Sequence, residues 1–400
     1  MRTELLSPAG DMERLLMALH YGADAVYLAG TAFGMRASAG NFDEAALRKA
    51  VQLCHERAVQ VHVTCNTLPR EPELARLPAY LELLSDIGVD ALIVADLGVI
   101  ALAKKYAPNT ALHISTQLGV VNSETCKVIF DMGASRAVLA RELSLEEIRQ
   151  IRLNAPQELE LEAFVHGAMC VSFSGRCLLS NYLTGRDANR GECAQPCRWK
   201  YHLVEEKRPG EYFEISEDKG TYIMNSNDLC MIEHLPELID AGITSFKIEG
   251  RMKSAYYAAA VTNAYRHALD AAIAARPLEQ VWVEEVEKIS HRKYCTGFYF
   301  GDPGQYYSNS DSIYFASADV CAVVESCDAA GNAILTQRNK FSVGDTVELL
   351  TNDGEPQAFT VFEIRNKDSE PIDSTPHPMM VLHMRLPKPC APLSLLRKPK

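Results

Sequence analysis

The sequence lacks any stretch of about 18 uninterrupted apolar residues, the length that a membrane-spanning helix needs, although 47% of its 400 residues are hydrophobic. The first residues also lack the charged region, apolar run and small-residue cleavage site of a secretory signal. We therefore expect a cytoplasmic protein that makes no membrane contact. A hydrophobic content this high supports a full core, and the length suits one large domain and one small one.

An excess of positive charge is also missing, because 40 Lys and Arg residues stand against 52 Asp and Glu residues, for a net charge of −12. This balance argues against a surface that coats nucleic acid in general, but it leaves room for a local basic site. The segment from residue 176 to residue 200 has such a bias, because its only acidic residues are Asp187 and Glu192. Its cations are Arg176, Arg186, Arg190, Arg198 and Lys200. The basic C-terminal tail, with Arg397 and Lys398, is interpreted as solvated surface charge.

Three motifs of known chemistry are absent. No Gly-x-Gly-x-x-Gly follows the first expected strand, which argues against the usual dinucleotide-binding site. No Gly-x-Ser-x-Gly is present, so the nucleophile elbow of a serine hydrolase is not expected. No His-Glu-x-x-His is present either, which removes the common zinc-protease motif.

A repeated pattern predicts the fold. Gly22, Gly88, Gly133 and Gly242 each follow a helical stretch and precede an apolar run of strand length. Strands are expected near residues 5, 27, 62, 93, 113, 138, 162 and 246, and helices over 11–21, 44–57, 75–87, 143–153 and 234–240. Eight buried parallel strands that alternate with helices predict a (β/α)8, TIM-like barrel. A doubly wound open sheet is the alternative.

The chain divides into a barrel domain over residues 1–290, a linker over 291–318 and a small domain over 319–400. A Cys-rich insertion at about 170–222 falls between the seventh and eighth strands, which places it at the C-terminal face of the barrel, where active sites lie. Beyond the linker, short apolar runs alternate with turn signals such as those at 330–332 and 352–354. This pattern predicts a small antiparallel β-barrel.

Twelve cysteines are present, and disulfides are disfavoured in the cytosol, so clustered cysteines indicate metal or redox chemistry. Four thiolates from one loop region can hold a zinc ion or a 4Fe–4S cluster. The spacing lacks the paired Cys-x-x-Cys hooks of a zinc ribbon and favours the larger cluster. The expected ligands are Cys170, Cys177, Cys193 and Cys197, and Cys230 is interpreted as a buried structural thiol.

The residues around the first two of these cysteines carry a specific motif. Glu162 and Phe164 are followed by Gly-Ala-Met-Cys170, then by a Gly-x-Cys that ends at Cys177 and by Ser180. In this motif the chain resembles peptidase family U32. The resemblance covers essentially the whole chain. It continues through residues 7–10, 189–191, 247–251 and 294–301.

The resemblance implies one of two activities. The family was named for collagenase-like proteases, but other members are oxygen-independent hydroxylation proteins that carry a 4Fe–4S cluster. The chain is most similar to the tRNA hydroxylation branch, which makes 5-hydroxyuridine at the wobble position, with prephenate implicated as the source of the hydroxyl group. We expect such a tRNA-modifying enzyme, which uses a small-molecule hydroxyl donor. The alternatives are a U32-type peptidase, in which His166 would activate Cys170, and a non-catalytic RNA-binding or assembly partner of another protein.

Polar residues at the expected strand ends complete the candidate site. Glu162 and His166 are expected to face the barrel mouth, either as a general acid and base or as a hydrogen-bonded structural pair. Lys247 is expected on the interior face of the eighth strand, and Arg251, just past it, is a candidate for binding an anion. These four are the catalytic candidates. The candidates for substrate binding are Asn66, His113, Gln117, Arg141, Arg176 and Arg198.

Overall fold

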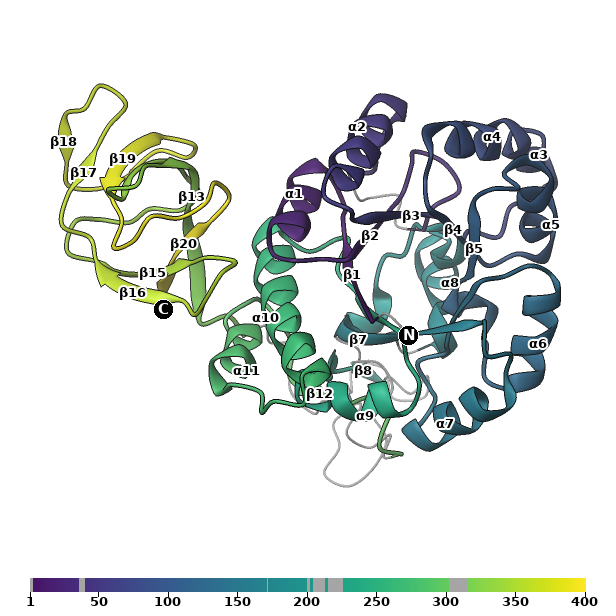
Figure 1. Cartoon of the computed structure of the whole chain (residues 1–400). Helices are drawn as coiled ribbons and strands as arrows, with labels where there is room; N and C mark the ends of the chain where they lie inside the picture. The colour runs from purple at the N-terminus through teal and green to yellow at the C-terminus, as the bar shows by residue number, and fades with distance from the viewer. Residues whose placement is uncertain are drawn as a thin grey trace.

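The computed structural model describes residues 3–35, 40–170, 172–199, 226–301 and 315–400, together with two short strands, β8 (His202–Leu203) and β9 (Phe213–Glu214). Lys200, much of the expected insertion and residues 302–314 of the expected linker lie outside the described residues. Figure 1 shows a barrel, coloured purple to green, with a smaller β domain, coloured green to yellow, beside it. No helix in the described ranges has the length and apolar character needed to cross a membrane.

The barrel wall consists of parallel strands that are buried on both faces, which is why most of their residues are apolar. Within the described residues eight strands close the barrel, because β11 pairs with both β1 and β7. They are β1 (Glu4–Pro8), β2 (Ala25–Leu28), β3 (Gln60–Cys65), β4 (Ala91–Val94), β5 (Ala111–Ile114), β6 (Arg136–Val138), β7 (Glu160–Ala168) and β11 (Ser245–Ile248). The predicted TIM-like barrel is therefore confirmed, and the open-sheet alternative is not.

Helices surround this wall (Figure 1). Most begin at a side-chain cap, such as Asp11, Asp43 or Ser144, whose oxygen accepts a hydrogen bond from the first helical turn. Gly88 ends α4 in the left-handed region, at φ 84°. The helices are α1 (Met12–His20), α2 (Glu44–His55), α3 (Glu71–Leu74), α4 (Leu77–Ile87), α5 (Leu97–Tyr106), α6 (Ser123–Asp131), α7 (Leu145–Asn154), α9 (Leu235–Asp240), α10 (Ala255–Ile273) and α11 (Gln280–Glu287).

The Cys-rich segment follows β7 and is built from short elements. They are the 3₁₀ helices η2 (Phe173–Gly175), η3 (Ala188–Arg190) and η4 (Pro196–Arg198) and the helix α8 (Leu179–Thr184). After the segment, β10 (Asp228–Cys230) pairs antiparallel with the end of β7 and parallel with β12 (Tyr294–Cys295). Cys230 was expected at the start of a helical segment, but it lies in β10, partly buried against Tyr265.

The C-terminal domain is an antiparallel sheet of eight strands, all within the described residues 315–400, that curves into a half-barrel around its own apolar core. The spatial order is β16-β15-β20-β13-β14-β19-β17-β18. The strands are β13 (Ala318–Cys327), β14 (Asn332–Gln337), β15 (Thr346–Leu350), β16 (Gln357–Thr360), β17 (Ile364–Arg365), β18 (Pro371–Ile372), β19 (Val381–Arg385) and β20 (Leu395–Pro399).

The C-terminal tail forms β20, and its interpretation as solvated charge was wrong for Arg397. The guanidinium of Arg397 is fully buried and donates to Glu285 of α11, to Glu348 of β15 and to the Tyr256 hydroxyl of α10. Arg397 therefore neutralises carboxylates inside the junction of the two domains. Lys398, in contrast, is partly exposed and pairs with Asp345 at 2.7 Å.

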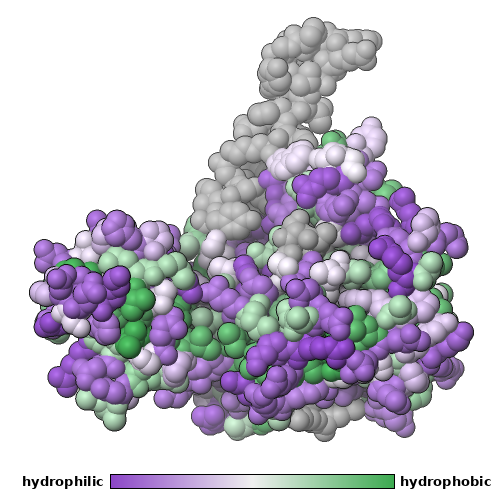
Figure 2. Space-filling view, turned by 90° about the horizontal axis from the view of Figure 1, so that it is seen from above, coloured by the Kyte–Doolittle hydropathy of each residue, from purple (hydrophilic) through white to green (hydrophobic). Residues whose placement is uncertain are grey.

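The two domains are also joined by neutral hydrogen bonds. The Tyr21 hydroxyl donates to the Leu350 carbonyl at 3.1 Å, and the Asn263 side chain donates to the Thr351 carbonyl at 3.1 Å. Figure 2 shows the β domain as a separate lobe at the left, on a face that is mostly hydrophilic. These buried contacts fix the position of the β domain against α1, α10 and α11.

Candidate functional site

A cavity of about 160 Å³ lies where the barrel strands end, beneath the Cys-rich segment. All four predicted cysteine ligands, Cys170, Cys177, Cys193 and Cys197, line it. The side chain of Lys247 lines it from the barrel side. The sequence prediction that these cysteines gather at the C-terminal face of the barrel agrees with this arrangement.

Hydrogen bonds within the Cys-rich segment hold the cysteines in place. The side chain of Asn189 accepts from the Cys177 backbone N–H at 3.1 Å and donates to the Cys177 carbonyl at 2.9 Å. The Ala194 N–H donates to the Ser180 hydroxyl at 3.0 Å, which fixes the chain next to Cys193. Each bond joins parts of the segment that are 12 or 14 residues apart, so the segment has a defined fold.

Other contacts attach the segment to the barrel. Arg190 makes two hydrogen bonds of 2.7 Å to Glu73 in α3, the fork-to-carboxylate geometry that is strongest for arginine. The backbone and hydroxyl of Ser174 donate to Glu142 at 2.6 and 2.7 Å. These bonds hold Ser174 at φ 44°, a strained value for a residue with a side chain. The roof of the cavity is therefore fixed at two sides.

The four cysteines are half-buried. Burial, and then the neighbouring Cys170, raise the pKa of Cys197 to about 11, and Cys193 and Cys177 act in the same direction. The Gln195 N–H donates to the Cys193 sulfur at 3.4 Å. Among the described residues, however, no three His, Cys, Asp or Glu side chains converge closely enough to hold one metal ion. The four thiols nevertheless share one cavity.

Lys247 forms a buried ion pair at the barrel side of the cavity. Its ammonium donates to Glu162 at 2.6 Å and lies 4.7 Å from the ring centre of Tyr27 and 5.4 Å from that of Phe164. Glu162 has no exposed surface. Burial alone would raise the pKa of Glu162, but Lys247 and Arg136 outweigh it and hold that pKa below its ordinary value. Glu162 is therefore an ionised partner of Lys247.

Two further charged residues extend this ion pair into a network that reaches toward the opposite end of the barrel. Arg136 donates to Glu162 at 3.1 Å and to Glu4 at 2.6 and 3.1 Å. Burial opposes ionisation of Glu4, yet the pKa of Glu4 is lowered to about 2, in part by Arg136. Neither Glu4 nor Arg136 was a candidate from the sequence. Each is the first residue of a buried strand. A charged residue at the start of such a strand was the signal that could have found them.

His166 lies away from the cavity, so it does not form the expected pair with Glu162. Its ring nitrogens face the hydroxyls of Tyr265 and Tyr294 at 3.3 and 3.4 Å, and burial lowers its pKa to about 3. The physical reason is a β-bulge. Lys247 pairs with Phe164, but the next residue of β11 pairs with His166, and the additional residue in β7 reverses the direction of the side chains that follow.

Five of the predicted substrate- and anion-binding residues line the cavity: Asn66, Gln117, Arg141, Arg198 and Arg251. The Arg141 guanidinium stacks 3.8 Å from the ring centre of Phe164 and donates to the Ala168 carbonyl at 3.2 Å. The amide of Asn66 accepts from the Met35 N–H at 3.2 Å. These contacts orient both side chains before any ligand binds.

His113 and Arg176 do not line the cavity. The ring of His113 is buried 4.6 Å from that of His62, inside the barrel, and burial holds the pKa of His113 well below its ordinary value. Arg176 is exposed on the outer side of the segment, where its Nε donates to the Gln117 carbonyl at 2.6 Å. Tyr27, at the end of β2, lines the cavity but was not a candidate. Its place at a strand end was the available signal.

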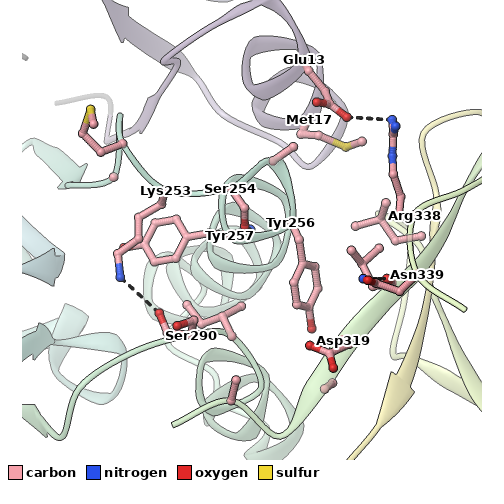
Figure 3. A pocket seen from close by; sticks show the side chains of 18 of the residues that line it. Glu13, Met17, Lys253, Ser254, Tyr256, Tyr257, Ser290, Asp319, Arg338 and Asn339 are labelled. Carbon is pink, nitrogen blue, oxygen red and sulfur yellow. Dashed lines mark hydrogen bonds and ion pairs between the residues drawn. The ribbon is translucent and has the colours of Figure 1, made fainter. Parts of the chain in front are cut away.

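A groove of about 760 Å³ adjoins this cavity, between α10 and β13 (Figure 3). Gln195, Arg198 and Glu249 line both spaces. Across the groove Arg338 of the β domain pairs with Glu13 of α1 at 2.8 Å, as Figure 3 shows. The junction between the domains therefore leads toward the Cys-lined cavity.

Comparison with known proteins adds family relationships. The model of peptidase family U32 matches residues 10–309, and the model of the U32 C-terminal domain matches residues 316–397. The chain is 36% identical to tRNA hydroxylation protein P1 of Bacillus subtilis, over 100% of this chain and 95% of that protein. It is 38% identical to an uncharacterized protease of Methanocaldococcus jannaschii, over 92% of each chain.

A third relative acts on a different RNA. The chain is 38% identical to the 23S rRNA 5-hydroxycytidine C2501 synthase of Escherichia coli, over 88% of this chain and 52% of that protein. The two family models together account for the barrel, the Cys-rich segment and the β domain. This chain belongs to peptidase family U32, and it contains the C-terminal domain of that family.

Proposed function

We propose that this protein is an RNA-modifying enzyme that hydroxylates a wobble uridine of tRNA to 5-hydroxyuridine without using molecular oxygen. The observation that carries the proposal is the cavity, which is lined by four cysteines and by Lys247, the partner of Glu162 in a buried ion pair at the barrel mouth. The names of two relatives, a tRNA hydroxylation protein and an rRNA hydroxycytidine synthase, support pyrimidine hydroxylation as the reaction class.

The barrel side of the cavity, away from the four cysteines, offers groups suited to a base. An enzyme that modifies a base must take that base out of its stack and hold it by its edge and faces. Tyr27 and Phe164 supply aromatic surface here, while Asn66 and Arg141 supply hydrogen-bond donors suited to uracil carbonyls. Lys247 is placed to hold or exchange a proton at the base.

The donor set suits an iron–sulfur cluster. Four cysteines line one space, and four cysteine thiolates are the usual ligands of a 4Fe–4S cluster. Cys170, Cys177, Cys193 and Cys197 would hold the 4Fe–4S cluster, which when bound supplies one-electron redox chemistry. We propose in addition a small-molecule hydroxyl donor, with prephenate as the candidate that the family resemblance suggests.

A peptidase is the second candidate, because the family model and one relative carry that name. A cysteine peptidase needs a thiolate activated by a histidine within hydrogen-bond reach. Among the described residues that line the cavity there is no histidine, and His166 is enclosed by tyrosines instead. The geometry therefore favours the hydroxylase over the peptidase.

The decisive experiment is nucleoside analysis, by mass spectrometry, of tRNA from a strain that lacks this gene. We expect 5-hydroxyuridine to disappear and to return with the wild-type gene and with Cys327→Ala, a control cysteine in the β domain. Cys170→Ala should not restore it. Unchanged 5-hydroxyuridine in the deletion strain would refute the proposal. If the Cys170→Ala variant and the Lys247→Met variant each restored 5-hydroxyuridine, the protein would be a non-catalytic partner of another enzyme.

A further inference from the structure

The outer side of the Cys-rich segment exposes large aromatic side chains. Tyr182 in α8 is 86% exposed, Phe173 in η2 is 52% exposed and Trp199 after η4 is 48% exposed. The same segment lines the cavity with its cysteines. We call these three aromatic residues, together with Arg176 and Arg186, the rim. Single exposed rings are common, but three of them within 27 residues of one segment indicate a binding surface.

The rim is positively charged although the whole chain is acidic. Within residues 173–199 there are four arginines, Arg176, Arg186, Arg190 and Arg198, against Asp187 and Glu192. Arg190 is paired with Glu73 and Asp187 lies 3.7 Å from Arg70, so the local excess of positive charge rests on the other arginines of the segment. Arg176 and Arg186 are exposed. In a chain with a net charge of −12, this local excess favours an anionic partner.

We propose that the rim binds the unpaired RNA nucleotides on either side of the modified base, by stacking their bases on Tyr182, Phe173 and Trp199. The inference rests on the proposed function. A nucleotide in the cavity remains covalently joined to its two neighbours, which must lie across the surface that surrounds the cavity. Those neighbours lose their own stacking when the target base leaves, and aromatic side chains replace it. Arg176 and Arg186 are exposed cations of the same segment and are assigned to the phosphates of these neighbours.

The rim is preorganised for this task. The α8 helix packs against η3 and η4, and the Thr184 hydroxyl donates to the Ser180 carbonyl at 2.6 Å. Asn189 of η3 is bonded to Cys177 on both its amide atoms. Tyr182 is therefore presented by a fixed element, and little conformational entropy is lost when a base stacks on it.

The test is equilibrium binding of a labelled tRNA anticodon stem-loop to the full-length protein, measured by fluorescence anisotropy. Tyr182→Ala should weaken binding by about 5- to 100-fold, the range for loss of one base–aromatic stack. Tyr182→Phe should bind like the wild type, because the ring is retained. Phe362→Ala, a control residue in the β domain that is also 86% exposed, should leave binding unchanged.

A second measurement uses the salt dependence. Arg186→Gln should reduce the slope of log Kd against log salt by about 0.7, the value for one phosphate contact with a single strand. If the wild type does not bind the stem-loop, the proposed function itself fails. If it binds and Tyr182→Ala binds equally well, or Phe362→Ala is equally weakened, the rim assignment is overturned. Normal RNA binding by Tyr182→Ala with loss of 5-hydroxyuridine in cells would instead indicate a protein partner, and would also overturn it.

Discussion

Replacing Arg397 by methionine should destabilise the protein strongly, because it leaves a buried carboxylate without its main cation. Arg397 and Glu285 have no exposed side-chain surface. Breaking such a pair by removing one partner costs about 3–5 kcal/mol. We expect the lower end, about 3 kcal/mol, because Lys288 lies 3.1 Å from Glu285 and retains part of the compensation.

The change can be measured by urea unfolding, followed by the fluorescence of Trp282, which lies in α11 beside the ion pair. With a dependence of about 3 kcal/mol per molar urea, the midpoint should fall by about 1 M. Arg365→Met is the matched control. Its guanidinium pairs with Glu363 on the surface of the same domain, and exposed pairs contribute about 0–1 kcal/mol.

We also expect a second substitution to restore the stability that Arg397→Met removes. In the double variant Arg397→Met/Glu285→Leu no buried carboxylate remains unpaired at position 285, and replacing a whole buried pair by apolar side chains is close to neutral. Most of the lost stability should therefore return. An Arg397→Met midpoint equal to that of Arg365→Met, or a double variant less stable than the single one, would refute the view that this pair is a buried, desolvated link between the domains.

Three further predictions concern the barrel. Ionised Glu4, with its pKa of about 2, stabilises the fold by roughly 3 kcal/mol above pH 4.5, and this contribution is lost as the pH falls toward 2. Chemical denaturation of Glu4→Gln should therefore show about that loss at pH 7 and a flatter acid limb, and an unaltered acid limb would contradict the assignment. Protein purified without oxygen should contain about four irons per chain, and Cys193→Ala should lose most of them in an iron assay, whereas one bound zinc would exclude the cluster. Lys247→Met should abolish 5-hydroxyuridine formation in cells with iron content unchanged, and full activity of this variant would remove Lys247 from the site.

Local sequence patterns predicted the framework well. Each of the eight barrel strands is largely buried on both faces, so apolar residues predominate in the set, and each strand lies within a few residues of its expected centre. The helix α5 was not predicted, because apolar residues occupy most of its positions and obscure the helical period. β20 was not predicted either, because its cations resembled those of a solvated tail.

The candidate site was predicted in part. The four cysteines lie within 28 residues of one another, so their grouping on one loop could be inferred from spacing alone, and several strand-end residues were found in the same way. The partners of Glu162 could not be inferred. Lys247 lies 85 residues away and Arg136 lies 26 residues away, and no local period connects them.

The sequence by itself determined the order of strands and helices, the types of donor atom near the barrel mouth and the family, because these depend on short-range periodicity and on residue identity. Only the tertiary structure decided which way each side chain faces and which charges are paired. A single bulge in β7 turned His166 from the cavity into a shell of tyrosines. The closing of a barrel and the docking of a second domain brought Arg397 to Glu285, 112 residues away, because burial of charge is tolerated only where the complete fold supplies the opposite charge.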